Sequence, residues 1–356
     1  MTPTALVIGA TGIAGYACSN ALLNAGYRVL GLSRTPRYEI KGVEQVYADL
    51  FDPDSLEKAL AAHKVTHLVF TAWQRRQTEA ENCAVNSTML KNAIETAVRS
   101  GELSHVALIT GLKYYLGPFE AYAKSAPETP FREEQGRLPY ENFYYVQEDL
   151  LADLGSRYGF SWTVLRPHTL IGYALGNVMN MGVTLSLYGS ICRFTGRPFV
   201  FPGSPQQWQG VTDITDSRLL GRQVVWAFAT PSARNQAFNS VNGDVFRWRW
   251  MWKQIAYELG VEPAEYPGHP SPLEEQMAEA DDVWSRIVRQ YDLKPYRASE
   301  LASWWHTDAD LGRPIEAFAS MNKSRASGFL EYQDSLESFR DLFQLLRAER
   351  IIPPAA

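Results

Sequence analysis

Three glycines stand at every third position, Gly9, Gly12 and Gly15, between a short apolar run and a segment with helical spacing. Glycine permits a tight turn and lets backbone N–H groups approach a pyrophosphate, which the positive end of the following helix stabilises. This spacing between a strand and a helix therefore predicts a dinucleotide-binding turn. The candidate cofactor contacts in this turn are Gly9, Thr11, Gly12, Ile13 and Gly15.

The end of the second expected strand indicates which dinucleotide binds. A carboxylate there would hydrogen-bond the ribose 2′-hydroxyl of NAD, whereas an arginine matches the 2′-phosphate of NADP. Residues 31–37 include Ser33 and Arg34 and no carboxylate, which favours NADPH, with a solvated surface arginine as the alternative. After the third expected strand, Asp49 is predicted to meet the adenine amino group, with a loop or helix-capping aspartate as the alternative. Leu50 is a further candidate cofactor contact.

The residue pair that usually performs reductions beside such a cofactor is missing. Short-chain reductases carry a tyrosine and, one helical turn later, a lysine. None of the 18 tyrosines has a lysine at that spacing, and Tyr144 has Glu148 there instead. Lys113 is the candidate for a catalytic cation, because it follows the fifth expected strand at the sheet edge where open α/β folds bind ligands. A solvated loop lysine and a packed core tyrosine are the alternative interpretations of Lys113 and Tyr144.

Alternating apolar and helical segments must position these residues. Strands are expected over 4–9, 27–32, 43–49, 66–72, 105–110 and 161–166, and helices over 13–25, 53–63, 79–100 and 141–158. This alternation predicts an α/β fold with a Rossmann-type, doubly wound parallel sheet that ends near residue 172. Beyond it the pattern is mainly helical. We therefore expect a dinucleotide-binding domain over 1–172 and a substrate-binding cap over 173–356, partly interleaved with the core.

Composition excludes several classes of protein. The 356 residues are 46% hydrophobic and 21% charged, which excludes a mainly disordered chain. The net charge of −5 without a basic patch argues against nucleic-acid binding, and no apolar run is long enough for a membrane span. Three scattered cysteines and the absence of a signal-peptide pattern favour a cytoplasmic location. No cluster has the spacing of metal ligands, so no metal is expected.

Two segments carry a resemblance to a known family. Residues 110–120 read TGLKYYLGPFE and residues 142–149 read NFYYVQED. Both resemble the progesterone 5β-reductase/iridoid synthase group of atypical short-chain dehydrogenases/reductases. Further similar segments, which extend the resemblance over nearly the whole chain, are 81–83, 238–246 and 321–324.

The resemblance implies an NADPH-dependent reductase that acts on activated C=C bonds in enones and enals, including steroid-like ones. It implies that Lys113 and Tyr144 are the catalytic lysine and tyrosine and that Arg34 contacts the cofactor 2′-phosphate. It also implies that Phe119 and Phe329 line an apolar pocket for a small hydrophobic enone. A homodimer is expected only by analogy with the family.

Elementary chemistry is compatible with this assignment. Hydride attack on the β-carbon of an enone places negative charge on the carbonyl oxygen, and a phenol hydrogen bond beside an ammonium lowers that barrier. An enolate is less basic than an alkoxide, so a lysine displaced from the helix is tolerable.

Two alternatives stay open. One is a ketone reductase or sugar-nucleotide epimerase, which the missing Tyr-x-x-x-Lys disfavours; the other is a non-catalytic NADPH-sensing protein.

Overall fold

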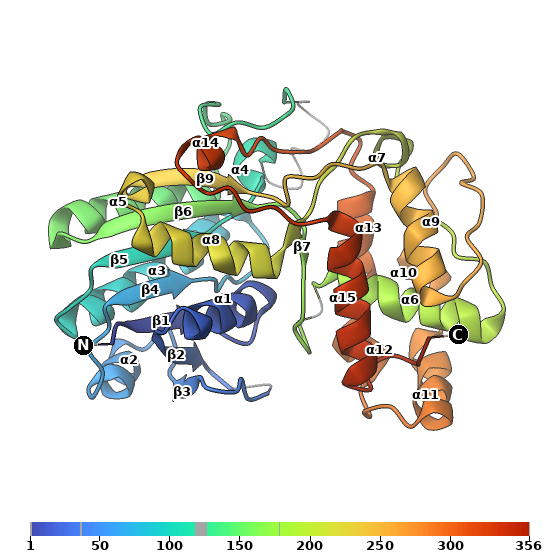
Figure 1. Ribbon diagram of the computed structural model, residues 1–356, viewed down its shortest axis with the longest axis horizontal. Helices are drawn as coiled ribbons and strands as arrows, with labels where there is room; N and C mark the ends of the chain where they lie inside the picture. The colour runs from blue at the N-terminus through green and yellow to red at the C-terminus, as the bar shows by residue number, and fades with distance from the viewer. Residues whose placement is uncertain (1, 36–37, 118–126, 178, 356) are drawn as a thin grey trace. The chain divides into compact units, whose positions relative to one another are not determined.

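The structure is a computed structural model that describes residues 2–35, 38–117, 127–177 and 179–355 (Figure 1). The chain divides into two units. Unit 1 comprises Met1–His168, Ser217–Val241 and Ala319–Glu331, and unit 2 comprises Thr169–Asp216, Asn242–Phe318 and Tyr332–Ala356. Two segments from beyond residue 172 therefore return to the unit that begins with the glycine-rich turn.

Seven parallel strands form the sheet of unit 1, in the order β3-β2-β1-β4-β5-β6-β9. The strands are β1 (Thr4–Ile8), β2 (Arg28–Ser33), β3 (Glu44–Tyr47), β4 (His67–Phe70), β5 (His105–Ile109), β6 (Ser161–Pro167) and β9 (Gln236–Ser240). The predicted Rossmann-type sheet is confirmed. The strand order reverses between β1 and β4, and open sheets of this kind bind ligands outside the carboxyl ends of the strands at that reversal.

Helices cover both faces of the sheet. They are α1 (Ile13–Asn24), α2 (Pro53–Leu60), α3 (Glu79–Arg99), α4 (Lys113–Leu116), α5 (Phe143–Tyr158), α8 (Ser217–Ala229) and α14 (Asn322–Ala326). Alternate strand residues such as Leu6, Ile8 and Val164 are buried with apolar residues of α2, α3 and α5. On the other face α1 packs closely on α8, because a Cβ on Gly221 would lie 2.7 Å from the carbonyl oxygen of Ala17.

The sheet continues beyond residue 172, so the predicted end of the sheet is wrong. Strand β9 reads QAFNS and lacks the apolar run by which the other strands are recognised. It pairs with β6, and its central Phe238 is fully buried and packs edge-on against Trp226 of α8. Contacts between distant segments, rather than local pattern, place this strand in the sheet.

Unit 2 is mainly helical, as the sequence predicts for the later part of the chain. Its elements are β7 (Leu170–Ile171), α6 (Met181–Thr195), α7 (Pro205–Gln209), β8 (Thr215–Asp216), α9 (Trp248–Leu259), α10 (Leu273–Gln276), α11 (Ala280–Tyr291), α12 (Ala298–Leu301), α13 (Trp304–Leu311) and α15 (Ser335–Ala348). In α9, Trp252 is buried and stacks on Phe199 at 4.0 Å between ring centroids, while Arg249 is exposed. Trp248 and Trp252 of α9 therefore serve packing, whereas Trp250 is exposed.

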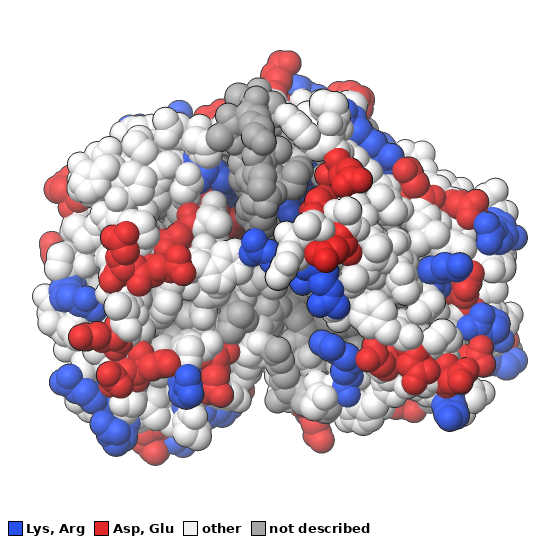
Figure 2. All heavy atoms as spheres, turned by 180° about the vertical axis from the view of Figure 1, so that it is seen from behind, with Lys and Arg blue, Asp and Glu red and all other residues white. Residues whose placement is uncertain are grey.

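The distribution of charged residues and the apolar character of the helices are consistent with the sequence, in which we found neither a basic patch nor a membrane-length apolar run. On the face drawn in Figure 2, the lysines and arginines of the described residues are interspersed with aspartates and glutamates rather than gathered in one basic area. None of the helices in the described ranges combines the length and apolar character that a membrane crossing requires.

Candidate active site

The glycine-rich turn connects β1 to α1 and brings the start of the helix close to the end of the strand. Gly9 has a φ of +79°, and the Gly12 N–H donates a hydrogen bond to the Gly9 carbonyl at 2.9 Å. A Cβ on Gly15 would lie 2.2 Å from the Gly9 carbonyl oxygen, so only glycine lets the helix pack on the turn. In the described structure no side chain caps α1, and its first turn holds no acidic residue. The positive end of α1 therefore suits the pyrophosphate of a dinucleotide.

The expected 2′-phosphate contacts lie at the end of β2. The Ser33 hydroxyl is buried and has no hydrogen-bond partner among the described residues. Arg34 is exposed and makes neither a hydrogen bond nor an ion pair within the described part of the chain. A buried donor without a partner beside an unengaged guanidinium fits a phosphate group.

The other expected cofactor contacts differ in exposure. Asp49 is exposed, and its Oδ1 accepts a hydrogen bond from the Phe51 N–H at 2.9 Å, which is the loop role weighed as the alternative. Leu50 is buried. The structure adds Tyr38, whose hydroxyl donates to the Thr11 carbonyl at 2.9 Å and ties the chain after β2 to the turn. Sequence analysis missed Tyr38 because no local pattern marks it.

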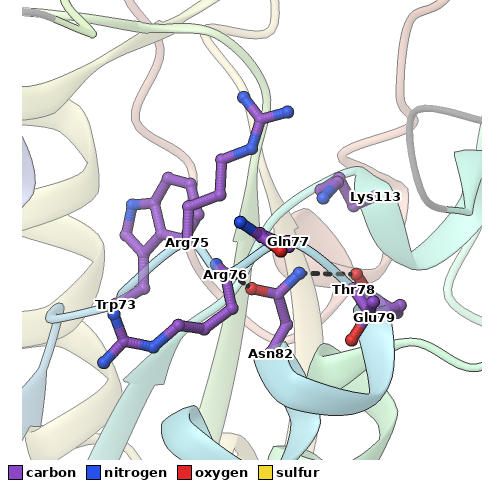
Figure 3. A pocket seen from close by; sticks show the side chains of 8 residues that line it. All are labelled: Trp73, Arg75, Arg76, Gln77, Thr78, Glu79, Asn82 and Lys113. Carbon is purple, nitrogen blue, oxygen red and sulfur yellow. Dashed lines mark hydrogen bonds between the residues drawn. The ribbon is translucent and has the colours of Figure 1, made fainter.

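A cavity opens where the chain leaves β4. The Thr71 hydroxyl donates to the Ile8 carbonyl at 2.7 Å, and a Cβ on Gly9 would lie 2.9 Å from Thr71 Oγ1, so this strand end contacts the glycine turn. Two residues later the chain borders a cavity of about 280 Å³ (Figure 3). The residues that line the cavity are Trp73, Arg75, Arg76, Gln77, Thr78, Glu79, Asn82 and Lys113.

Lys113 lies on this cavity, beside the helix that carries Tyr144. Its side chain is partly buried, and its Nζ lies 5.4 Å from the centroid of the Phe143 ring. The same ring contacts the Tyr144 ring at 4.3 Å between centroids and stacks with Trp73 at 6.1 Å. The structure thus brings the predicted lysine and tyrosine to one edge of the sheet, next to the loop that contacts the glycine turn.

Hydrogen bonds from three segments fix the first turn of α5. Asn142 caps the helix, because its Oδ1 accepts from the Tyr144 N–H at 3.0 Å. Its Nδ2 donates to the Lys113 carbonyl at 2.7 Å, so one buried amide joins the backbones of both candidate catalytic residues. Glu79 Oε1 accepts from the Phe143 N–H at 2.8 Å. These contacts satisfy helix-end donors that would otherwise be unpaired.

Tyr144 is not among the residues that line the cavity, and its hydroxyl differs from that of its neighbour in hydrogen bonding. The Tyr144 hydroxyl has no hydrogen-bond partner in the described ranges, whereas the neighbouring Tyr145 hydroxyl donates to the Tyr114 carbonyl at 2.6 Å. A Cβ on Gly111 would come within 3.3 Å of the Tyr144 hydroxyl, so the glycine leaves room for the phenol. Burial, together with the Glu79 carboxylate, raises the pKa of Tyr144 above its usual value. The phenol is therefore a hydrogen-bond donor at neutral pH.

Of the two predicted substrate contacts, the structure describes only Phe329. Phe119 lies outside the described residues. Phe329 is 2% exposed and packs against Trp226 of α8, with ring centroids 5.5 Å apart. It does not line the cavity. Its contact with a substrate stays a prediction.

Across the described ranges, no group of three or more His, Cys, Asp or Glu residues is arranged to hold a metal ion.

Residues 46–353 match the family described as the PRISE-like Rossmann-fold domain. The chain belongs to this family. The resemblance seen in the sequence is therefore confirmed, and the match covers most of both units.

Curated relatives of this family member are enzymes. The chain is 35% identical over 361 residues to an (S)-8-oxocitronellyl enol synthase of Nepeta cataria, covering 98% of this chain and 93% of the relative. It is 34% identical over 362 residues to a 3-oxo-Delta(4,5)-steroid 5-beta-reductase of Arabidopsis thaliana, with the same shares covered. The alignments span nearly all of this chain and most of each relative.

Solved structures resemble the fold at low sequence identity. The UDP-glucose 4-epimerase of Thermotoga maritima superposes with a TM-score of 0.68 at 14% identity, over 97% of this chain and 99% of that one. The UDP-glucose 4-epimerase of Thermus thermophilus, in complex with NAD, gives 0.67 at 19% identity over the same shares. At these identities the likeness shows the fold only.

Proposed function

We propose that this PRISE-like family member is an enzyme that reduces the C=C bond of α,β-unsaturated carbonyl compounds with hydride from NADPH. The observation that carries the proposal is the Tyr144 hydroxyl, which has no partner among the described residues and lies at the sheet edge that Lys113 shares. Family membership supports the reaction class, since curated relatives carry the names of an enol synthase and a steroid 5-beta-reductase.

The residues present fit the cofactor. A Cβ on Gly9 or Gly15 would collide with neighbouring protein atoms, so these glycines let α1 begin close to the turn, and no side chain caps α1 in the described structure. Ser33 and Arg34 would hold the 2′-phosphate. When bound, the dinucleotide supplies the hydride.

The protein side chains stabilise the charge that develops on the substrate. As the β-carbon accepts hydride, negative charge gathers on the carbonyl oxygen, and Tyr144 donates a hydrogen bond to that oxygen. Lys113 adds a positive charge at the same edge and offsets the Glu79 carboxylate. The resulting enolate needs no proton from Tyr144, and water can protonate the α-carbon. A neutral phenol therefore suffices, which accords with the absence of lysine one turn after Tyr144.

A product assay separates this reaction from its alternatives. With NADPH and a small cyclic enone, we expect the saturated ketone as the product, identified by gas chromatography with mass detection. An allylic alcohol would identify a ketone reductase instead. Tight NADPH binding without NADPH oxidation across a panel of enones and enals would support the non-catalytic sensing protein. Conversion of a UDP-sugar to its epimer would support the epimerase.

Reversing the charge of Arg34 tests the choice of cofactor. In Arg34→Glu we expect the ratio of kcat/KM for NADPH to that for NADH to fall by about 10²-fold, because a carboxylate repels the 2′-phosphate and accepts from a 2′-hydroxyl. Steady-state kinetics with both cofactors measures the ratio. Lys58→Glu, at an exposed position in α2, makes the same charge reversal and should leave the ratio unchanged. An unchanged ratio in Arg34→Glu would show that Arg34 does not contact the phosphate.

A further inference from the structure

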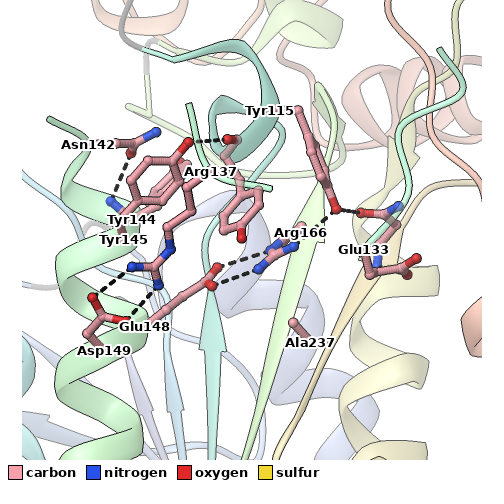
Figure 4. A network of polar contacts seen from close by, with 12 residues as sticks. Tyr115, Glu133, Arg137, Asn142, Tyr144, Tyr145, Glu148, Asp149, Arg166 and Ala237 are labelled. Atoms are coloured by element: carbon pink, nitrogen blue, oxygen red, sulfur yellow. Dashed lines mark hydrogen bonds and ion pairs between the residues drawn. The ribbon is translucent and has the colours of Figure 1, made fainter. Parts of the chain in front are cut away.

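A buried ion pair occupies the position where a short-chain reductase has its lysine. Glu148 follows Tyr144 by one helical turn in α5 and is bound by Arg166 of β6 through two hydrogen bonds, Nε to Oε1 at 3.0 Å and Nη2 to Oε2 at 2.7 Å. Their side chains are 10% and 4% exposed. Figure 4 shows the pair below Tyr144, between α5 and the sheet.

The same guanidinium also holds α4, the helix that begins with Lys113. The central carbon of Arg166 lies 3.3 Å from the centroid of the Tyr114 ring, and its Nη1 donates to the Tyr115 hydroxyl at 3.1 Å. The Tyr115 hydroxyl in turn donates to Asn239 Oδ1 at 2.7 Å, which ties α4 to β9. Arg166 therefore contacts both helices that carry the candidate catalytic residues.

Geometry explains why such a contact is needed here. A tyrosine and a lysine on one helix keep their separation through the helix itself. Lys113 and Tyr144 lie on two helices, so their separation depends on contacts between α4 and α5. Asn142 provides one such contact through the Lys113 carbonyl. The Tyr145 hydroxyl provides a second through the Tyr114 carbonyl, while Arg166 adds a contact at the next turn.

The energetics favour a role in geometry over a role in stability. Two charges removed from water gain little net stability compared with apolar residues of similar size, whereas the planar guanidinium fixes its partners in direction. Here it satisfies a carboxylate, a phenol hydroxyl and an aromatic face together.

We propose that the Arg166–Glu148 pair is a positioning device that sets α4 against α5 and thereby the separation of the Lys113 amine and the Tyr144 phenol. The inference rests on the proposed function, because it assigns the pair a purpose in that reaction. Arg166 and Glu148 act through these two residues and do not touch the substrate.

Glu148→Gln tests the proposal, because it keeps the size of the side chain and removes its charge. We expect kcat for enone reduction to fall by roughly tenfold or more, since small displacements of catalytic groups cost factors of that size. KM for the enone and the Kd of NADPH should stay within about twofold, because the pair is buried and lies outside the cavity lining.

A matched control lies one residue further along the same helix. Asp149 also forms a two-bond ion pair, with Arg137 at 2.8 and 2.6 Å, but these side chains are 65% and 38% exposed (Figure 4). Asp149→Asn removes the same charge from a pair at the surface and should leave kcat within about twofold.

A double-mutant cycle separates positioning from general stability. In a Tyr144→Phe background, Glu148→Gln should have little further effect on kcat, because the group that it positions is gone. Equal fold-losses in both backgrounds, or a wild-type kcat in Glu148→Gln alone, would overturn the proposal. If Tyr144→Phe itself retains wild-type kcat, the proposed function of the site fails instead, whatever Glu148→Gln does.

A milder variant covers the case in which Glu148→Gln does not fold. Tyr115→Phe keeps the ion pair and removes only the hydroxyl that links Arg166 to Asn239. We expect kcat to fall several-fold in the Tyr144 enzyme and to be unchanged by the same substitution in the Tyr144→Phe enzyme. Equal effects in both would overturn the proposal.

Discussion

Tyr144→Phe is expected to lower kcat for enone reduction by about 10²-fold, while the Kd of NADPH stays unchanged. The substitution removes the one hydrogen bond that the phenol gives to the developing enolate, and loss of a single such donor typically costs a factor of that order. The ring remains, so the contact with Phe143 and the cap from Asn142 are retained. Stopped-flow measurement of NADPH oxidation gives kcat, and quenching of protein fluorescence gives the Kd.

Tyr145→Phe is the matched control for this prediction. The Tyr145 hydroxyl donates to the Tyr114 carbonyl and accepts from the Leu138 N–H at 3.1 Å, so its removal lowers the melting temperature. Because this bond also joins α5 to α4, we expect kcat to fall by up to a few-fold, well short of the loss in Tyr144→Phe. Comparable losses of kcat in the two variants would mean that packing, rather than hydrogen bonding to substrate, explains the effect of Tyr144→Phe.

The pH profile gives a second measure of the role of Tyr144. Because burial and Glu79 raise the pKa of this phenol, the protonated donor persists to pH values above about 10 and is lost only as the pH rises through the raised pKa. We therefore expect no decrease of the wild-type kcat between pH 7 and pH 10 that depends on Tyr144. A decrease depends on Tyr144 if it is present in the wild type and absent in Tyr144→Phe. Such a decrease near pH 7 would indicate that the protonated phenol is required but that its pKa is lowered rather than raised.

Local patterns in the sequence were sufficient to predict strands β1 to β6 and the glycine-rich turn. Apolar runs predicted β1 through β6 within a few residues, and the glycine spacing predicted the turn between β1 and α1. Each of these signals lies within a short segment. A parallel strand that is buried on both faces requires consecutive apolar residues, and a tight turn requires glycine. Strand β9 lacked such a signal, since its place depends on pairing with β6.

The supporting residues of the site could not be predicted in the same way. Glu79 accepts from the N–H of Phe143, a residue 64 positions later in the chain, and Arg166 reaches Glu148 across a helix–strand contact. Glutamate and arginine are common at surfaces, so their types carry no information about such partners. Asn142 is recognisable as a helix cap by its type, but its second bond to the Lys113 carbonyl is visible only in the fold.

Gly15→Ala is expected to weaken NADPH binding by tenfold or more and to lower the melting temperature. The added Cβ would lie 2.2 Å from the carbonyl oxygen of Gly9, 2.7 Å from its carbonyl carbon and 2.8 Å from the Cα of Ala10. All three atoms belong to the backbone, so α1 must move away from the turn to which we assign the pyrophosphate contacts. Isothermal titration calorimetry gives the Kd, and differential scanning calorimetry gives the melting temperature.

The direction in which the melting temperature of Gly15→Ala changes tests this prediction. Without a collision, alanine in a helix interior is favoured over glycine by about 1 kcal/mol, which would raise the melting temperature. A rise in melting temperature would show that α1 accommodates the methyl group without displacement. Gly136→Ala adds the same methyl group where no atom lies within 4 Å, and it should change neither quantity. A folded Gly15→Ala protein that binds NADPH with the wild-type Kd would mean that the cofactor does not depend on the close approach of α1 to the turn.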